Sequence, residues 1–445
     1  MKRVITYGTY DLFHEGHYNL LKNAKSLGDY LIVGVTSDYF DRLRGKFNVR
    51  ESLMQRVENV RATGFADEII VEEYFGQKIE DIRKFNVDIF TVGSDWKGYF
   101  DYLNEYCEVR YLPRTDGISS TQIRNSNALK LGIIGNEKIL DRLLEECTFV
   151  TGIEVVGAFT EVKDSDSEYT SKQFSSLKQY DSIEELIDST DAIYINLPLS
   201  ERDATIDKVL DGKRHVLTEF PFSTSVLKTK ELLNKAKDNN LILMEGLKTA
   251  YAPAFTKMIA IARSGQIGKI LNVEANFTQV LGEELSNQIR IAGGSVLSLG
   301  AYPLLGIFKL LGFNYKKLDF ISYKQNGVDI LSKINLIYDD SMGSATIAIN
   351  AKAEGDMVVS GSKGYIYIPA PWWKTEYFEL RFEDTNRNQK YFYKFEGEGL
   401  RYELIEFQKC INDGVESFLM SHSDILEEVK VLEAYTNNHN VTIIA

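Results

Sequence analysis

The sequence predicts an α/β protein in which two units with parallel sheets are followed by a domain rich in long strands. Its 445 residues exceed what one ordinary core holds, so several domains are expected. Short β-rich runs alternate with helical apolar spacing from residue 3, and the alternation restarts near residue 129. After about residue 250, long strand-like stretches replace it. We therefore place domains at residues 1–127, 128–250 and 251–445.

The first unit begins with a strand at residues 3–7, a polar loop at 8–17 and a helix at 18–28. A strand at 30–37 follows, then a helix carrying Leu53, Val57 and Val60, and strands at 68–71 and 88–93. Strands that alternate with helices are typical of a parallel sheet covered by helices.

Residues Asn125–Ala128 are small and mostly polar, and the βα pattern restarts after them. Strands are expected at 131–135, 153–160, 192–198, 215–220 and 241–246, with helices between them, as in a doubly wound, Rossmann-type fold. Stretches at 270–280, 333–340, 344–351 and 377–384 predict an open-faced antiparallel sheet, closed by a helix near 402–413. Residues 293–312 are apolar, but Ser295, Ser298, Pro303 and Lys309 interrupt them, which favours a buried helix over a membrane span.

Composition limits the possible partners and the compartment. Residues are 44% hydrophobic and 26% charged, as in globular proteins, and the net charge of −13 argues against binding nucleic acid or an anionic membrane surface. The three cysteines form no CxxC pair, so neither a disulfide framework nor a zinc ribbon is expected. Polar residues interrupt the apolar run that a signal peptide needs, and we expect a cytoplasmic protein.

Two of the five histidines, His14 and His17, stand three residues apart directly after the first predicted strand. In a loop from strand to helix, this spacing puts two imidazoles and the first amides of a helix around one point, where the helix dipole favours an anion. Gly8 and Gly16 would let the backbone approach a triphosphate closely. The alternatives are a metal pair, for which no third ligand is visible nearby, and two structural histidines.

Three motifs resemble those of the glycerol-3-phosphate cytidylyltransferases, within the wider HxGH nucleotidyltransferase family. They are TYGTYDLFHEGHYNLLKNAKSLGDYLIVGV at 6–35, VGSDWKGYFDYL at 92–103 and RTDGISST at 114–121. The resemblance implies attack of a polyol phosphate oxygen on the α-phosphorus of CTP, with Mg²⁺ assisting and pyrophosphate leaving. Such a reaction depends mainly on positioning and charge neutralisation.

The resemblance also assigns residues. It implies catalytic His14, His17, Lys46 and Arg114, CTP contacts from Thr9, Tyr10, Gly16, Arg114, Thr115, Ser119, Ser120 and Thr121, and acceptor contacts from Asp11, Arg44 and Lys46. Arg56 matches a family arginine if one residue is inserted. Taken alone, Arg44 and Lys46 could be solvated surface charge, and Ser119 could simply cap a helix. Ser94 and Asp116 depart from the family pattern, which leaves the base and the acceptor open.

From Leu129 onward the chain resembles the Gfo/Idh/MocA oxidoreductases. The matching landmarks are SIEELIDSTDAIYINLP, GKRHVLTEFPFS, LILMEGL, SGQIGKI and GGSVLSLGAYP, in the family order. The implied dinucleotide site would use Gly135, Glu219 and Tyr302. Glu137 replaces the second glycine of the fingerprint, Thr160 replaces the acidic residue that holds the ribose, and Phe220 replaces the motif lysine. These departures argue against NAD(P), which stays a candidate cofactor.

We therefore expect a cytidylyltransferase that acts on CTP and a polyol phosphate, most simply glycerol-3-phosphate, for teichoic-acid-like or capsular polymers. The second half is expected to have lost ordinary hydride transfer and to serve as a scaffold, a dimerising sheet or a regulatory ligand site. The alternative is a bifunctional enzyme whose second half reduces a carbonyl precursor to the polyol phosphate. Trp372 and Trp373 could line a pocket there or pack in the sheet. Both families suggest a homodimer, with no membrane insertion.

Overall fold

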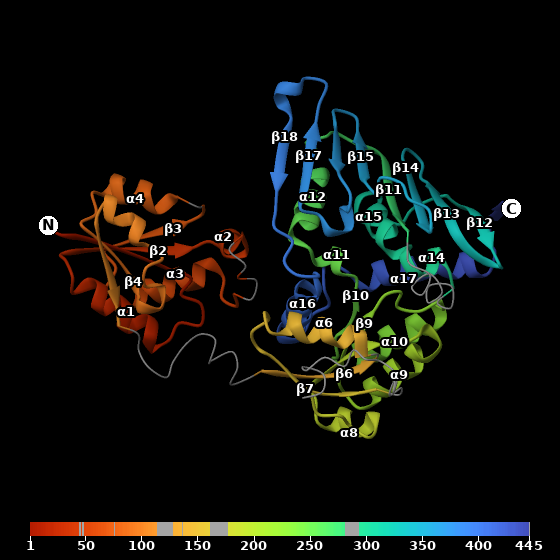
Figure 1. Ribbon diagram of the computed structural model, residues 1–445, viewed down its shortest axis with the longest axis horizontal. Helices are drawn as coiled ribbons and strands as arrows, with labels where there is room; N and C mark the ends of the chain where they lie inside the picture. The colour runs from red at the N-terminus through yellow and green to blue at the C-terminus, as the bar shows by residue number, and fades with distance from the viewer. Residues whose placement is uncertain are drawn as a thin grey trace. The chain divides into compact units, whose positions relative to one another are not determined.

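The computed structural model describes residues 1–43, 46, 49–74, 76–113, 128–135, 137–160, 177–280 and 293–444 (Figure 1). The chain divides into two compact units, Met1–Ala128 and Leu129–Ala445. Among the residues in these ranges, no helix is long and apolar enough to cross a membrane.

The first unit is built around a parallel sheet of order β3-β2-β1-β4-β5. Its elements are β1 Arg3–Gly8, α1 Glu15–Lys25, β2 Tyr30–Thr36, α2 Asp38–Leu43, α3 Leu53–Ala62, β3 Glu68–Glu72, α4 Gln77–Phe85, β4 Ile89–Gly93, η1 Ser94–Trp96, η2 Asp101–Glu105 and β5 Glu108–Leu112. The predicted α/β class of this unit is confirmed, and each predicted strand lies within about two residues of its expected place.

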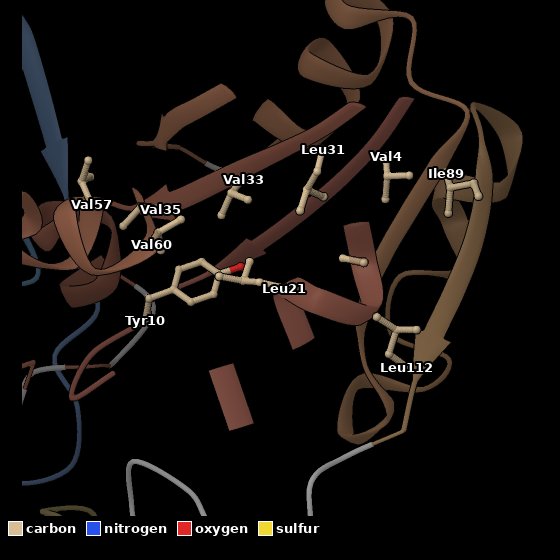
Figure 2. Close-up of a cluster of buried hydrophobic side chains, with 11 residues drawn as sticks. Val4, Tyr10, Leu21, Leu31, Val33, Val35, Val57, Val60, Ile89 and Leu112 are labelled. Carbon is tan, nitrogen blue, oxygen red and sulfur yellow. The ribbon is translucent and has the colours of Figure 1, made fainter. Parts of the chain in front are cut away.

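Alternating residues of these strands face two separate cores. Val4, Leu31 and Ile89 pack with residues of α1 and α3, and Figure 2 shows this cluster. Their neighbours in sequence point to the opposite face, where they pack with residues of α4 and η2. Because both faces of the sheet are covered, its central strands β1, β2 and β4 are mainly apolar, as parallel strands in α/β proteins are, whereas the edge strand β5 carries exposed Glu108 and Arg110.

Side-chain caps explain where two helices of this unit begin. The His14 ring accepts a hydrogen bond from the Gly16 amide, so α1 starts at Glu15, three residues before the predicted start. Ser52 and Gln55 form a capping box at the start of α3. The histidine predicted to bind phosphate is thus also the residue that begins the helix.

The second unit opens with another parallel sheet, of order β10-β9-β8-β6-β7. Its elements are β6 Leu129–Gly135, α6 Glu137–Cys147, β7 Ile153–Phe159, α8 Ile183–Asp188, β8 Ala192–Asn196, α9 Leu199–Asp211, β9 His215–Glu219, α10 Val226–Asp238 and β10 Leu243–Gly246. All five predicted strands are present, and the strand order reverses beside β6, as in a doubly wound fold.

The rest of this unit forms a nine-stranded sheet of order β18-β17-β16-β15-β11-β14-β13-β12-β19 in the described part of the chain. Its elements are α11 Lys248–Tyr251, α12 Pro253–Arg263, β11 Ile270–Gln279, α14 Ser295–Leu299, α15 Ala301–Leu311, β12 Lys317–Gln325, β13 Val328–Ile337, β14 Met342–Ile349, β15 Met357–Gly361, β16 Tyr365–Ile368, η3 Trp372–Lys374, β17 Tyr377–Arg381, η4 Thr385–Arg387, β18 Gln389–Phe392, α16 Leu400–Asp413, α17 His422–Thr436 and β19 Val441–Ile444. The expected antiparallel pairing dominates, but β11 pairs parallel to β14 and β12 pairs parallel to β19. The sheet is therefore mixed.

Two helical predictions in this region need correction. The apolar segment expected as one buried helix forms two, α14 and α15, which meet at Gly300. A Cβ at Gly300 would lie 2.4 Å from the Val296 carbonyl oxygen, so only glycine fits this junction. The helix predicted to close the chain, α16, is followed by α17 and by β19, which pairs with β12 at the edge of the nine-stranded sheet.

Candidate functional site

The two motif histidines lie side by side where β1 ends and α1 begins. Their ring centroids are 3.9 Å apart and the ring planes differ by 24°. Because His14 Nδ1 accepts from the Gly16 amide at 3.0 Å, a neutral His14 ring carries its proton on Nε2. The structure therefore brings together the imidazole donors and the helix N-terminus that the sequence predicted for an anion.

Tyr10 holds the loop before these histidines in place. It is 1% exposed, belongs to the core in Figure 2, and packs edge-on against His17 with ring centroids 5.5 Å apart. Burial raises the pKa of its hydroxyl. Tyr10 and Leu12 both have φ near +50°, at 55° and 50°, a conformation that side chains rarely adopt. Strain of this kind is typical of functional loops.

Thr9 and Lys46 come together beside this loop. The Thr9 hydroxyl donates to Asp41 Oδ1 at 2.8 Å and accepts from Lys46 Nζ at 3.1 Å. The Lys46 amide also donates to the Asp41 carbonyl oxygen at 2.8 Å. The predicted CTP residue Thr9 and the predicted phosphate cation Lys46 are thus in direct contact, with Lys46 on the surface.

Arg56 lies beneath the same loop and is fully buried. Its guanidinium donates to the carbonyl oxygens of Thr9 at 2.7 Å, Thr36 at 2.8 Å and Glu51 at 3.0 Å, and it pairs with Asp38. Sequence comparison matched it only loosely. A stronger signal in the sequence was its spacing, three residues after Leu53 and four before Val60, which puts Arg56 on the buried face of α3. A charge buried there must have partners.

Asp11, the predicted acceptor residue, is 2% exposed. Its Oδ1 accepts from the amides of Arg50 at 3.0 Å and Glu51 at 2.9 Å. These bonds hold the segment that enters α3 against the histidine loop. The contact of Asp11 with an acceptor stays a prediction.

A second polar group lies at the carboxyl ends of β1 to β3, and sequence analysis did not identify it. Glu72, at the end of β3, is fully buried, pairs with Lys78 and accepts from the Thr36 hydroxyl at 3.0 Å. The Lys78 ammonium lies 4.6 Å from the centre of the Tyr7 ring. Parallel α/β sheets bind their ligands at this edge, so the place of Glu72 at a strand end was the available signal.

Several predicted residues fall outside the described part of the chain: Arg44, Arg114, Thr115, Ser119, Ser120 and Thr121. Within the described ranges, no group of three or more His, Cys, Asp or Glu side chains is placed to hold a metal ion.

In the second unit, Glu219 ends β9 and is half-buried among aromatic and cationic neighbours. The Tyr194 hydroxyl donates to Glu219 Oε1, and Arg202 donates to the Glu219 carbonyl oxygen at 2.9 Å. Burial raises the pKa of Glu219. Phe220, which replaces the motif lysine, packs edge-on against Tyr302 with ring centroids 4.8 Å apart. Burial and the charge of Glu219 raise the pKa of the Tyr302 hydroxyl, so the two predicted residues lie in the same region.

Gly135 ends β6 directly before α6, so the N-terminus of α6 lies at the carboxyl edge of the sheet. A Cβ at Gly135 would lie 2.6 Å from the Asn196 carbonyl oxygen, so the close approach of β6 and β8 here needs glycine. Asn136 and the Glu137 side chain fall outside the described residues.

Residues 5–126 match the family model described as cytidylyltransferase-like. The glycerol-3-phosphate cytidylyltransferase of Bacillus spizizenii is 53% identical over 128 residues, which cover 29% of this chain and 98% of that protein. The enzyme of the same name from Staphylococcus aureus is 48% identical over 126 residues, covering 28% and 93%.

Residues 129–247 match the model of the Gfo/Idh/MocA oxidoreductase family, described as an NAD-binding Rossmann fold. The trans-1,2-dihydrobenzene-1,2-diol dehydrogenase of Sus scrofa is 29% identical over 279 residues, covering 57% of this chain and 81% of that protein. The 3-ketoreductase KijD10 of Actinomadura kijaniata, solved with NADP and TDP-benzene, superposes with a TM-score of 0.62 at 18% identity, covering 72% and 100%. That likeness concerns the fold alone. The chain belongs to the cytidylyltransferase family through its first unit, and its second unit is an oxidoreductase domain of the Gfo/Idh/MocA type.

Proposed function

We propose that the first unit transfers CMP from CTP to a polyol phosphate, with glycerol-3-phosphate as the first choice, and releases pyrophosphate. The observation that carries this proposal is the stacked pair His14 and His17 at the N-terminus of α1, with Lys46 and Thr9 in contact beside it. The names and identities of the bacterial relatives support the acceptor.

In the proposed reaction, a phosphate oxygen of the polyol phosphate attacks the α-phosphorus of CTP. A new P–O bond forms, the bond from the α-phosphorus to the bridging oxygen breaks, and pyrophosphate leaves with that electron pair. His14 and His17 donate hydrogen bonds to oxygens whose charge grows in the transition state, while Lys46 offsets triphosphate charge. Mg²⁺ held mainly by the phosphates would neutralise further charge, and that arrangement needs no metal cage from the protein.

The remaining residues have supporting parts in this proposal. Arg56 and Asp11 fix the histidine loop against β2 and α3 through bonds to backbone groups. Lys78 offers a second cation at the carboxyl edge of the sheet, where the acceptor phosphate would lie. The motif residues Arg114, Thr115, Ser119, Ser120 and Thr121, and the CTP contacts of Gly16 and Tyr10, are proposed from the motifs.

Pyrophosphate release by the full chain with CTP, Mg²⁺ and glycerol-3-phosphate tests the proposal. The His17→Ala variant should lose at least about a hundredfold in kcat, because general acid or hydrogen-bond donation of this kind contributes about that much or more. His439→Ala is the matched control, since His439 is exposed in the second unit, and it should keep full activity. Full activity in His17→Ala would end the assignment of His17.

For the second unit we propose a ligand-binding role within domains 128–250 and 251–445. Glu137 departs from the glycine fingerprint, but the match to an NAD-binding Rossmann family and the N-terminus of α6 near Gly135, at the carboxyl edge of the sheet, support NAD(P) as the proposed cofactor of any activity there. The bound dinucleotide would supply hydride, and Tyr302 beside Glu219 would hold the exchanging proton. The influence of Glu219 on the Tyr302 hydroxyl supports the bifunctional alternative, in which a ketose phosphate is reduced to the polyol phosphate.

NADPH oxidation measured with dihydroxyacetone phosphate separates the two possibilities for this unit. Oxidation coupled to CDP-glycerol formation would support a bifunctional enzyme, and none would leave the second unit a binding or scaffold domain. We also propose a cytoplasmic homodimer whose CDP-polyol feeds teichoic-acid-like or capsular polymers.

A further inference from the structure

The second unit has a cation beside Glu219 that no motif indicated. Lys248 is the first residue of α11, separated from the end of β10 only by Leu247, and it is half-buried. Burial raises the pKa of the Glu219 and Glu403 carboxyl groups, and the Lys248 ammonium opposes that rise in both. Phe220 places no charge here, so the cation comes from a neighbouring strand end instead.

Glu403 approaches the same point from α16. It is fully buried, and both of its carboxyl oxygens are without a hydrogen-bond partner among the residues that the structure describes. A Cβ at Gly246 would lie 3.2 Å from its Oε2, so the glycine that ends β10 makes room for this carboxyl group. Burial and the nearby Glu219 raise the pKa of Glu403 well above its usual value. A carboxyl group kept protonated in this way donates a hydrogen bond to a carbonyl or hydroxyl oxygen.

A row of aromatic rings adjoins these groups. Tyr302 packs on Phe277 with ring centroids 5.0 Å apart, and Phe277 stacks on Trp373 at 3.7 Å. The Thr249 hydroxyl donates to the Trp373 carbonyl oxygen at 2.7 Å, which ties the helix that carries Lys248 to this row. Trp372 is fully buried and belongs to the core, whereas Trp373 is half-buried and belongs to the row.

We propose that Lys248 and Glu403 form the polar half of a second binding site, at the carboxyl edge of β9 and β10, for a small hydroxylated carbonyl compound that carries a phosphate. Glu403 binds the carbonyl or hydroxyl oxygen, Lys248 binds the anion, and Tyr302 and Trp373 cover the carbon chain. The choice of phosphate as the anion rests on the polyol phosphate chemistry proposed for the first unit.

The test measures binding of dihydroxyacetone phosphate and of uncharged dihydroxyacetone to the full chain by ligand-observed NMR, with excess CDP-glycerol present to occupy the first unit. Lys248→Met should weaken binding of the phosphate at least tenfold and leave binding of dihydroxyacetone unchanged. Lys374→Met is the matched control, because Lys374 lies next to Trp373 but is paired with Glu398 at 2.9 Å, and it should bind both compounds like the wild type.

Glu403 is tested with two variants whose thermal melting shows that they fold. Glu403→Leu should weaken binding of both compounds about tenfold, and Glu403→Gln should restore it, because the amide keeps a donor and an acceptor. A wild type that binds neither compound, equal phosphate binding by Lys248→Met, or the whole effect appearing in Lys374→Met would overturn the proposal. Pyrophosphate release from CTP and glycerol-3-phosphate, measured on the same protein preparations without CDP-glycerol, reports on the first unit alone, so failure of either proposal is recognised separately.

Discussion

Replacing Arg56 by methionine should loosen the first unit around its candidate phosphate site. The guanidinium is fully buried, donates to the carbonyl oxygens of Thr9 and Thr36, pairs with Asp38, and lies 3.6 Å from the buried Asp41 carboxylate. Methionine fills most of this volume but removes the cation that faces these groups. Removing one partner of a buried ion pair costs about 3–5 kcal/mol.

Hydrogen exchange followed by mass spectrometry on the full chain measures this cost locally. Because about 1.4 kcal/mol is a factor of ten, amides of β1, β2 and α3 should exchange on the order of a hundred to several thousand times faster in Arg56→Met. Peptides from β8 in the second unit should exchange at the wild-type rate, which makes each sample its own reference.

Arg61 on the same helix provides the control. Its pair with Glu58 is exposed, with the Arg61 side chain 61% accessible, and such pairs contribute at most about 1 kcal/mol. In Arg61→Met, the amides of β1, β2 and α3 should therefore exchange at almost the wild-type rate. Wild-type exchange in Arg56→Met, or equal acceleration in the two variants, would refute the role we assign to the buried guanidinium.

Further predictions concern the second unit. Burial raises the pKa of Glu245 to about 8, so the wild type should lose stability as the pH rises from about 4.5 to 8, by up to about 1.4 kcal/mol per pH unit. The melting temperature of Glu245→Gln should depend less on pH over this range. The same pH dependence in both proteins would contradict the prediction. Arg401→Met should lower the melting temperature through a cost of about 3–5 kcal/mol, because Arg401 binds the buried Glu146 carboxylate at 2.8 Å; an unchanged melting temperature would be the contrary result. Burial raises the pKa of Cys147 and Cys410 to about 12, so iodoacetamide at pH 8 should modify them only in denaturant, as mass spectrometry would show, and rapid labelling of the native chain would disprove their burial.

The elements that the sequence predicted well are those fixed by local pattern. The strands of both parallel sheets follow short apolar runs except β5, whose alternating charged residues gave no such run, and it was not predicted. The two histidines are close in sequence, so their meeting at one helix start needed no knowledge of the fold. The extent of α1 was less certain, because its first residue depends on a bond from the Gly16 amide to the His14 ring, and no apolar spacing marks that bond.

The groups that the sequence did not identify are those joined across long stretches of chain. Glu403 meets Gly246 and Glu219 only because α16 returns to the end of β10. In the sequence Lys248 looks like an ordinary charged residue after a strand. Only the fold shows that its charge acts on the Glu219 and Glu403 carboxyl groups. Tertiary contacts of this kind leave no periodic signal in the sequence.

On the proposed function the first unit binds a triphosphate although the chain carries a net charge of −13, and we expect Arg56 and Lys46 to have different parts in this. Arg56 is buried among Asp38, Asp41 and backbone carbonyl oxygens, so its charge serves the loop, whereas Lys46 is on the surface and bonds a hydroxyl. Lys46→Met should therefore raise the KM for CTP at least about tenfold while the exchange of β1 amides stays at the wild-type rate. Arg56→Met should change both. If Lys46→Met also accelerated exchange, or left KM unchanged, the division of roles between these two cations would be wrong.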